Sequence, residues 1–395
     1  MTSKNFIFQT GHAKGLARIE IEAILGDVIK EEVKDGFLVE AEIPDPVELL
    51  SRMGSTVRIT EVIQSGPSRM PLNFEEWVVK AISEAKSKHE GKFRYGLSMH
   101  PKSEKVLKNV LIGSKKKLKA TGNVRFVNKD FQNLSSVQAW HQKLLKSNAM
   151  ELHLFQADKR WYLSHTVAIQ NFEWYSERDY ERPSKSAKNG MFPPKLAQIL
   201  INLAQAEKGS TIFDPFCGSG TVLQEALLMG YEATGSDLVK QMVEDSEVNL
   251  KWLLTQRQVG NLPKYKLFEA DATKLTADQI PANTSIVTET WLGPMLTKEL
   301  TELERPKVQR EVETLYEDFF SNFKKVVKEK TIMVFTAPYH RDKNERYFLP
   351  RLPEILDKYT KVIPISDHER PSLFFERKSQ FVSREIWKVE ISPAE

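Results

Sequence analysis

The residues best suited to chemistry lie in one short run, Thr211-Ile-Phe-Asp-Pro-Phe-Cys-Gly-Ser-Gly-Thr221, between an apolar strand and a predicted helix. Gly218 and Gly220 allow a tight turn and a close approach of a ligand to the backbone. The helix that begins near Thr221 offers free N–H groups, which suit a carboxylate or a phosphate. Asp214 would repel phosphates but can accept hydrogen bonds from an ammonium group, and no Gly-Lys-Ser/Thr follows that would make a P-loop.

Two further carboxylates follow at the ends of the next predicted strands. Asp237 ends Gly235-Ser-Asp237, where a carboxylate can hold both hydroxyls of a ribose, and Asp271 can accept from an adenine amino group. Each feature alone has an ordinary explanation, because glycine turns and aspartate helix caps are common. In this order and at this spacing, they predict S-adenosylmethionine as the cofactor. The residues expected to bind it are Asp214, Phe216, Gly218, Gly220, Asp237, Asp271 and Ala272.

A parallel sheet is needed to bring these loops to one edge. After residue 173 apolar strands alternate with long helices, the pattern of an α/β domain. The longest predicted helix covers Thr301–Lys328. The predicted strands are Thr211–Phe213, Ala233–Ser236, Tyr265–Glu269, Ser285–Thr288, Thr331–Thr336, Lys361–Ile365 and Phe381–Ile391.

The residues before 173 predict smaller α+β modules. Residues 1–65 contain short strands around a helix, and the Gly, Pro and Ser of Gly66–Pro71 predict a linker. A second α+β module of about a hundred residues follows. The polar stretch Tyr175–Asn189 marks the main boundary, and Arg178, Asp179 and Arg182 within it could pair with one another or contact RNA.

Positive charge is concentrated in the first part of the chain. Residues 51–150 carry 19 Lys and Arg against 7 Asp and Glu. Such an excess suggests a polyanion bound by one module and modified by another. The residues expected to contact RNA are Lys115, Lys116, Lys117, Lys119 and Arg125. The alternative is that this lysine run is only the solvated face of a helix.

Composition excludes several classes of protein. With 395 residues, 41% hydrophobic and 28% charged, the chain has the composition of a soluble protein of two or three domains. No run is apolar enough for a membrane helix, and no signal peptide is evident, so we expect a cytoplasmic protein. The single cysteine, Cys217, and the scattered histidines predict neither a disulfide nor a metal site.

Several longer motifs resemble one family. "DPFCGSGT", "GSD" and "EADA" resemble the Rossmann-type S-adenosylmethionine-dependent methyltransferases. "RDYERP…GMFPPKLAQILINLA", "RMGSTVRITEVI" and "SQFVSREIWKVE" are similar to the THUMP-domain tRNA guanine-N2 methyltransferases. The resemblance implies a ferredoxin-like domain at 1–65, a THUMP domain at 66–172 that binds tRNA, and a seven-stranded methyltransferase domain at 173–395 whose last strand is antiparallel. Some relatives need a small activating protein partner. The resemblance leaves open the oligomeric state, the tRNA position and the number of methyl groups.

The fourth strand departs from that family. Its members end this strand in an Asp-Pro-Pro-Tyr-like tetrapeptide, whose acid accepts from the amine and whose aromatic ring stacks on the base. Here Glu289 takes the acidic position, both prolines are missing, and Trp291 supplies the ring. We expect Glu289 to be catalytic and Trp291 to stack on the base. The alternatives are a strand-end residue near a decayed site and plain core packing.

These features favour methyl transfer to the exocyclic N2 of a guanosine in tRNA. One rival is an RNA-binding protein that keeps the cofactor fold and has lost catalysis, which the altered segment from Glu289 to Leu292 supports. Another is a methyltransferase for a different amine.

Overall fold

The computed structural model describes residues 3–11, 13–68, 73–184, 192–257, 263–296, 298–342, 345–366, 370–376 and 380–394. The chain divides into two compact units, Met1–Phe172 and Glu173–Glu395. This division falls where the third domain was expected to begin. None of the helices in the described ranges is long and apolar enough to cross a membrane.

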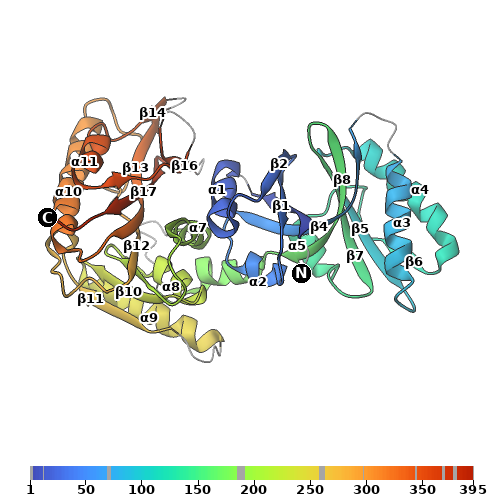
Figure 1. The fold of residues 1–395 in the computed structure, drawn as a ribbon, viewed down its shortest axis with the longest axis horizontal. Helices are drawn as coiled ribbons and strands as arrows, with labels where there is room; N and C mark the ends of the chain where they lie inside the picture. Colours follow the sequence, from blue (N-terminus) through green and yellow to red (C-terminus); the bar gives the residue numbers. More distant parts are fainter. Residues whose placement is uncertain are drawn as a thin grey trace. The chain divides into compact units, whose positions relative to one another are not determined.

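The first unit is built on an eight-stranded sheet with the order β2-β3-β1-β4-β8-β7-β5-β6 (Figure 1). Its strands are β1 (Lys4–Thr10), β2 (Ile29–Val33), β3 (Gly36–Ala41), β4 (Thr56–Pro67), β5 (Phe93–His100), β6 (Val124–Phe126), β7 (Ala149–Gln156) and β8 (Arg160–Ile169). Its helices are α1 (Lys14–Leu25), α2 (Pro46–Ser51), α3 (Phe74–Lys86), α4 (Glu104–Leu118), the short 3-10 helix η1 (Lys119–Thr121) and α5 (Ser136–His141).

The expected boundary between residues 65 and 66 falls inside a strand. β1, α1, β2, β3, α2 and β4 follow one another, and β1 lies antiparallel between β3 and β4. β4 then pairs antiparallel with β8, so one sheet continues through the predicted linker. Gly66 and Pro67 end β4 opposite Trp161 and Arg160, a position where a strand tolerates proline. Residues 69–71 of that linker lie outside the described residues.

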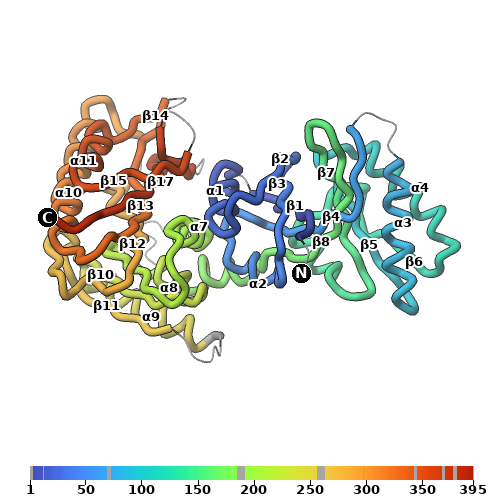
Figure 2. The backbone as a smooth tube through the Cα atoms, in the orientation of Figure 1, coloured from blue at the N-terminus to red at the C-terminus, as the bar shows by residue number. Residues whose placement is uncertain are grey.

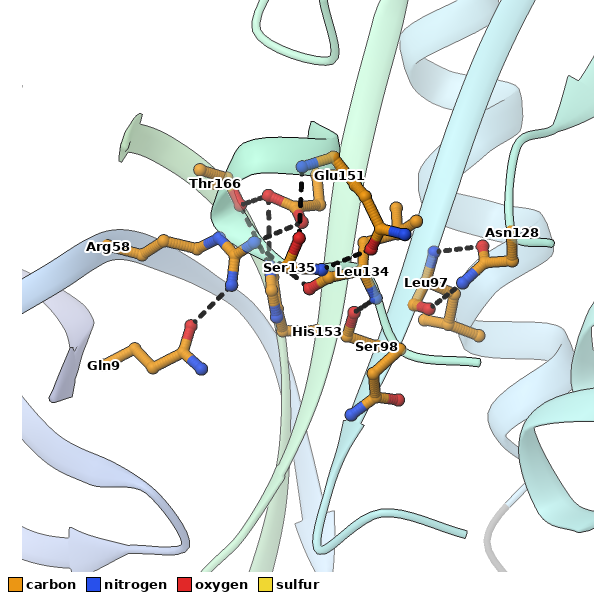
Figure 3. Close-up of polar contacts among 12 residues, drawn as sticks. Gln9, Arg58, Leu97, Ser98, Asn128, Leu134, Ser135, Glu151, His153 and Thr166 are labelled. Carbon is orange, nitrogen blue, oxygen red and sulfur yellow. Dashed lines mark hydrogen bonds and ion pairs between the residues drawn. The ribbon is translucent and has the colours of Figure 1, made fainter. Parts of the chain in front are cut away.

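A buried polar network joins four strands of this sheet, β1, β4, β7 and β8 (Figure 3). Arg58 on β4 donates to Gln9 on β1 at 2.9 Å and forms an ion pair with Glu151 on β7 at 3.1 Å. Thr166 on β8 donates to the same carboxylate at 2.7 Å. Burial lowers the pKa of the neighbouring His153 to about 4, so this imidazole is neutral. Buried charge of this kind is tolerated because each group has a partner.

The second unit contains the predicted α/β sheet, whose path through the chain can be followed from α7 to β17 in Figure 2. Its strands are β9 (Thr211–Asp214), β10 (Glu232–Asp237), β11 (Tyr265–Glu269), β12 (Thr284–Glu289), β13 (Thr331–Asp342), β14 (Glu345–Tyr347), β15 (Lys361–Val362), β16 (Leu373–Phe375) and β17 (Val382–Ile391). Its helical segments are α6 (Phe172–Ser176), the π-helical turn η2 (Glu177–Glu181), α7 (Pro194–Ala204), α8 (Thr221–Leu228), α9 (Lys240–Arg257), the 3-10 helix η3 (Ala272–Lys274), α10 (Arg305–Val326) and α11 (Leu352–Tyr359).

All seven predicted strands are present. The main sheet has the order β11-β10-β9-β12-β13-β17-β15, with β14 added to β13 and β16 to β17. β9 to β13 are parallel, and β17 runs antiparallel to β13, as expected. β13 continues for six residues past Thr336, where β12 ends, and pairs there with β17 and β14. This extension was not predicted.

The core of the second unit comes from aromatic residues spaced by three or four along α10. Val312, Tyr316, Phe319, Phe320 and Phe323 are all fully buried against the sheet. This spacing puts them on one face of the helix, which is why α10 packs along its whole length. α10 begins four residues later than predicted, at Arg305. The packed sheet holds the loops at its carboxyl edge in place.

Candidate active site

The glycine loop joins β9 to α8. Gly220 has φ +83°, and a Cβ there would lie 2.9 Å from Oγ of Ser246, so the loop packs closely on α9. Gly218 has φ +52°, but a Cβ there would meet no atom within 4 Å. No side chain caps the first turn of α8. The loop therefore combines a packed side at Gly220 with an open side at Gly218, where a ligand can approach.

Asp214 ends β9 and is 2% exposed. Its Oδ1 accepts from Oγ1 of Thr288 at 2.6 Å and from the backbone N–H of Phe216 at 3.1 Å. Burial raises its pKa to about 7, and the negative charges of Asp237 and Glu289 act in the same direction. A cationic ligand would relieve both effects, which fits the predicted ammonium contact.

Asp237 ends β10 and holds the glycine loop. Its Oδ2 accepts from the backbone N–H of Gly218 and its Oδ1 from that of Val239, both at 2.9 Å. Burial raises its pKa, against the opposing effect of these two hydrogen bonds. Each oxygen of the Asp237 carboxylate can still accept a further hydrogen bond, so ribose hydroxyls could bind there. That contact stays a prediction.

Asp271 lies two residues beyond β11 and acts as the N-cap of η3. Its Oδ1 accepts from the backbone N–H and the hydroxyl of Thr273, and its Oδ2 from Lys274 at 2.8 Å. Burial raises its pKa, but the hydrogen bonds from Lys274 and Thr273 outweigh burial, so the net shift is downward. Ala272 is buried in the core, and Phe216 packs edge-to-face on Phe319 at 5.2 Å. Contacts of these three predicted residues with an adenine stay predictions.

Glu289 ends β12 and forms an ion pair that the sequence did not suggest. Nε of Arg384, on β17, donates to Oε1 of Glu289. The Glu289 side chain is 20% exposed and the Arg384 side chain is 6% exposed. Arg384 also donates to Gln380 at 3.1 Å, so its guanidinium is held from two sides. The pair fixes the direction of the Glu289 carboxylate at the carboxyl edge of the sheet.

Trp291 is not part of the core, so the alternative of plain core packing is wrong. Its side chain is 40% exposed. The preceding Thr290 is buried, and its hydroxyl contacts Tyr316 and donates to the carbonyl of Thr336 at 2.7 Å. A fixed Thr290 beside an exposed Trp291 leaves the indole accessible to a planar group.

Two arginines that precede the glycine loop are buried against α8. Arg178 is 2% exposed and grips Glu225 through Nε at 2.6 Å and Nη2 at 3.2 Å. Arg182 is 1% exposed, and its Nη1 donates to Oγ1 of Thr221 at 2.6 Å. Neither side chain lies on an open surface. Of the two interpretations left open for these arginines, contact with an RNA backbone is therefore wrong.

The predicted RNA-contact residues lie in the first unit, on or after α4. Lys115, Lys116, Lys117, Lys119 and Arg125 are all exposed. Lys117 forms an ion pair with Glu75 at 3.0 Å, and Nζ of Lys115 lies 5.7 Å from the ring centre of Phe126. The structure thus places all five on the surface, although Lys117 is partly neutralised.

The structure brings Asp214, Gly218, Asp237 and Glu289 together at one edge of the sheet. Sequence reasoning missed Thr288, the donor to Asp214, and Arg384, the partner of Glu289. The last strand also carries Glu385, Lys388 and Glu390, so its sequence held no signal that singled out Arg384. Within the described ranges, no group of three or more His, Cys, Asp or Glu could hold a metal ion.

Comparison with known proteins connects this site with methyl transfer. Residues 182–347 match the family model described as an RMKL-like methyltransferase domain. Residues 72–248 match a model described as a DNA methylase, which ends before the strand that carries Glu289. Both matches contain the glycine loop and Asp237.

The chain is similar to curated tRNA (guanine(10)-N2)-dimethyltransferases. The chain is 28% identical over 184 residues to a tRNA (guanine(10)-N2)-dimethyltransferase of Methanothermobacter thermautotrophicus, which covers 46% of this chain and 49% of that protein. It is 30% identical over 183 residues to the protein of the same name from Methanocaldococcus jannaschii, covering 45% and 47%. The chain thus matches about half the length of these relatives.

Solved structures share the fold over the whole chain. TrmN from Thermus thermophilus is 15% identical, with a TM-score of 0.52 over 98% of this chain and 99% of that one. A possible methylase from Clostridium difficile 630 is 13% identical, with a TM-score of 0.51 over 100% and 99%. The chain therefore has the α/β fold of these methylases.

Proposed function

We propose that this protein is an S-adenosylmethionine-dependent methyltransferase that acts on the exocyclic N2 of a guanosine in tRNA. The observation that carries the proposal is the position of Glu289 beside Asp214 and Asp237 at one sheet edge. The names of the curated relatives and the methyltransferase-domain match support it.

The residues present fit the cofactor. Asp214 has one oxygen without a donor among the described residues, and its raised pKa favours a cationic partner. The space beside Gly218 is open, because a Cβ there would meet no atom within 4 Å. In this proposal Asp214 binds the ammonium group and Asp237 the ribose hydroxyls, with Asp271, Ala272 and Phe216 around the adenine. The bound cofactor supplies an electrophilic methyl group.

The acceptor amine needs activation because its lone pair is delocalised into the guanine ring. In this proposal the Glu289 carboxylate accepts a hydrogen bond from the amine and later takes its proton. Arg384 holds Glu289 in the direction that this contact requires. Trp291 stacks on the base and keeps the amine in line with the methyl group.

The first unit would bind the tRNA. The topology of β1 to β4 with α1 and α2 supports a ferredoxin-like module at 1–65, and the mixed sheet with its basic helix α4 supports a THUMP module at 66–172. Lys115, Lys116, Lys117, Lys119 and Arg125 would contact phosphates, which adds affinity without sequence preference. In this proposal the activity is cytoplasmic.

Methyl transfer from labelled cofactor to unmodified tRNA tests the proposal. We expect the wild type to label guanosine and Glu289→Gln to lower kcat by about a hundredfold or more, because the amide cannot take the proton. Calorimetry should show that both proteins bind the cofactor equally. A wild type that binds cofactor and transfers nothing would support the RNA-binding rival, and label on adenosine would support the other-amine rival.

A further inference from the structure

Arg182, the second of the two arginines that precede the glycine loop, has hydrogen-bond donors with no role in the proposed function. Arg182 follows η2, and the segment after it is fixed to the loop by Asn249 on α9. Asn249 accepts from the backbone N–H of Ser184 at 2.9 Å and donates to the carbonyl of Ser219 at 3.0 Å. Together with the bond from Nη1 of Arg182 to Thr221, these contacts place Arg182 at the N-terminus of α8.

Arg178 and Arg182 differ in one informative respect. Arg178 uses the edge formed by Nε and Nη2 to hold both oxygens of Glu225. The same edge of Arg182, again Nε and Nη2, is buried and has no acceptor among the described residues. Two parallel N–H donors on this edge match a carboxylate in a bidentate arrangement.

The surrounding charge also favours an anion. Arg178, Arg182 and Lys195 lie near two carboxylates, Asp179 and Glu225. Burial lowers the pKa of Arg182, and Asp179 and Glu225 only partly offset this effect. A buried guanidinium with unused donors is costly, and an anion that bonds to both removes the cost. The N–H groups at the start of α8 add to the same preference.

We propose that Arg182 binds the carboxylate of the cofactor's amino-acid end through Nε and Nη2. The assignment rests on the proposed function and deepens it. Asp214 and Arg182 then lie at the two ends of the glycine loop, one for the ammonium group and the other for the carboxylate. Arg182 is a specificity-determining residue, because a nucleoside without a carboxylate gains nothing from it.

Calorimetry with two matched ligands tests the assignment. S-adenosylmethionine and its decarboxylated form differ only in the carboxylate. We expect the wild type to prefer the complete ligand, and Arg182→Met to weaken its binding by about fiftyfold while the decarboxylated ligand changes by less than about twofold. Arg182→Lys, which keeps the charge and loses the fork, should fall between them.

Arg178→Met is the control, because Arg178 has a protein partner. It should lower the melting temperature by removing the buried ion pair with Glu225, without changing the ratio of the two affinities. Arg182→Met should not lower the melting temperature of the ligand-free protein. If Arg182→Met and Arg182→Lys discriminate as well as the wild type, or lose both ligands equally, the Arg182 assignment is overturned and the proposed function stands. If the wild type binds neither ligand, the proposed function and this assignment both fall.

Discussion

At the residue scale, the site depends on one buried carboxyl group whose charge is costly without a ligand. Asp214 is 2% exposed, and burial raises its pKa from 3.8 to about 7. The folded protein therefore binds more protons than the unfolded chain between these values, so this residue lowers stability as pH rises toward 7. A cation that binds Asp214 reverses the effect.

Asp214→Asn separates stability from binding. The variant should be more stable than the ligand-free wild type at pH 8, by about 4 kcal/mol, and the difference should vanish near pH 4. Wild-type affinity for the cofactor should rise with pH through about 7, whereas the variant should bind weakly at every pH. Calorimetry and thermal unfolding from pH 4 to 9 measure both. Asp357→Asn, on the exposed side of α11, is the control and should change neither.

Arg384 is predicted to act through Glu289. Arg384→Met should lower kcat by about tenfold to a hundredfold, since the Glu289 carboxylate loses the donor that orients it. The dissociation constant of the cofactor should stay within about twofold. Arg384→Lys should restore part of the rate. Equal losses in cofactor binding and in kcat would indicate a purely structural role.

The positions of Asp214, Asp237 and Glu289 at strand ends were predictable because each directly follows a predicted strand, and Asp271 comes two residues after another one. Arg384 was not, because it meets Glu289 across β13 and no local pattern connects residues 95 positions apart. The sequence of Trp291 allowed either stacking on a base or packing in the core. Its exposure in the structure decides against packing. The sequence thus predicted the strand ends on which these residues lie and missed Arg384, the long-range partner of Glu289, while the roles of these residues stay predictions.

At the element scale, apolar strands alternating with helices were sufficient to find seven of the nine strands described for the second unit; the two short strands β14 and β16 were missed. The extension of β13 beyond Thr336 was missed because it contains Pro338 and several polar residues, and its pairing depends on β17. β2 gives a similarly weak local signal: it is an edge strand with three consecutive charged residues, and β3 is its partner in the sheet. Elements whose partners are distant in sequence carry a weak local signal.

The glycine loop gives a test at this scale. Gly220→Ala should destabilise the protein by about 1–2 kcal/mol more than Gly230→Ala. Both glycines have a positive φ, but a Cβ at Gly220 would lie 2.9 Å from Ser246 and one at Gly230 meets nothing within 4 Å. Gly230→Ala therefore measures the backbone strain alone. Equal losses in urea unfolding would show that the packing of the loop on α9 is unimportant.

At the scale of the whole molecule, the chain consists of two units with different charge and different sheets. The boundary near residue 173 was predictable from composition. The fold has no break at the predicted boundary between residues 65 and 66, because β4 runs through this position and pairs with β8. Sequence composition indicates where a polar linker begins, but a glycine and a proline at the end of a strand produce the same signal.

The basic surface of the first unit should determine the salt dependence of tRNA binding. Changing Lys115, Lys116 and Lys119 together to Gln should weaken binding and lower the slope of log affinity against log salt by about 2–3. Cofactor affinity should not change. The matched control changes Lys325, Lys328 and Lys330 in the second unit and should leave the slope unaffected. An unchanged slope in the first variant would refute the proposed contact surface.

Nucleoside analysis of tRNA from cells that lack this protein tests the proposed activity most directly. The analysis should compare these cells with cells that regain the wild type or Glu289→Gln. We predict that N2-methylated guanosine falls in the deleted cells and returns only with the wild type. An unchanged content of N2-methylated guanosine, or its full return with Glu289→Gln, would contradict the account.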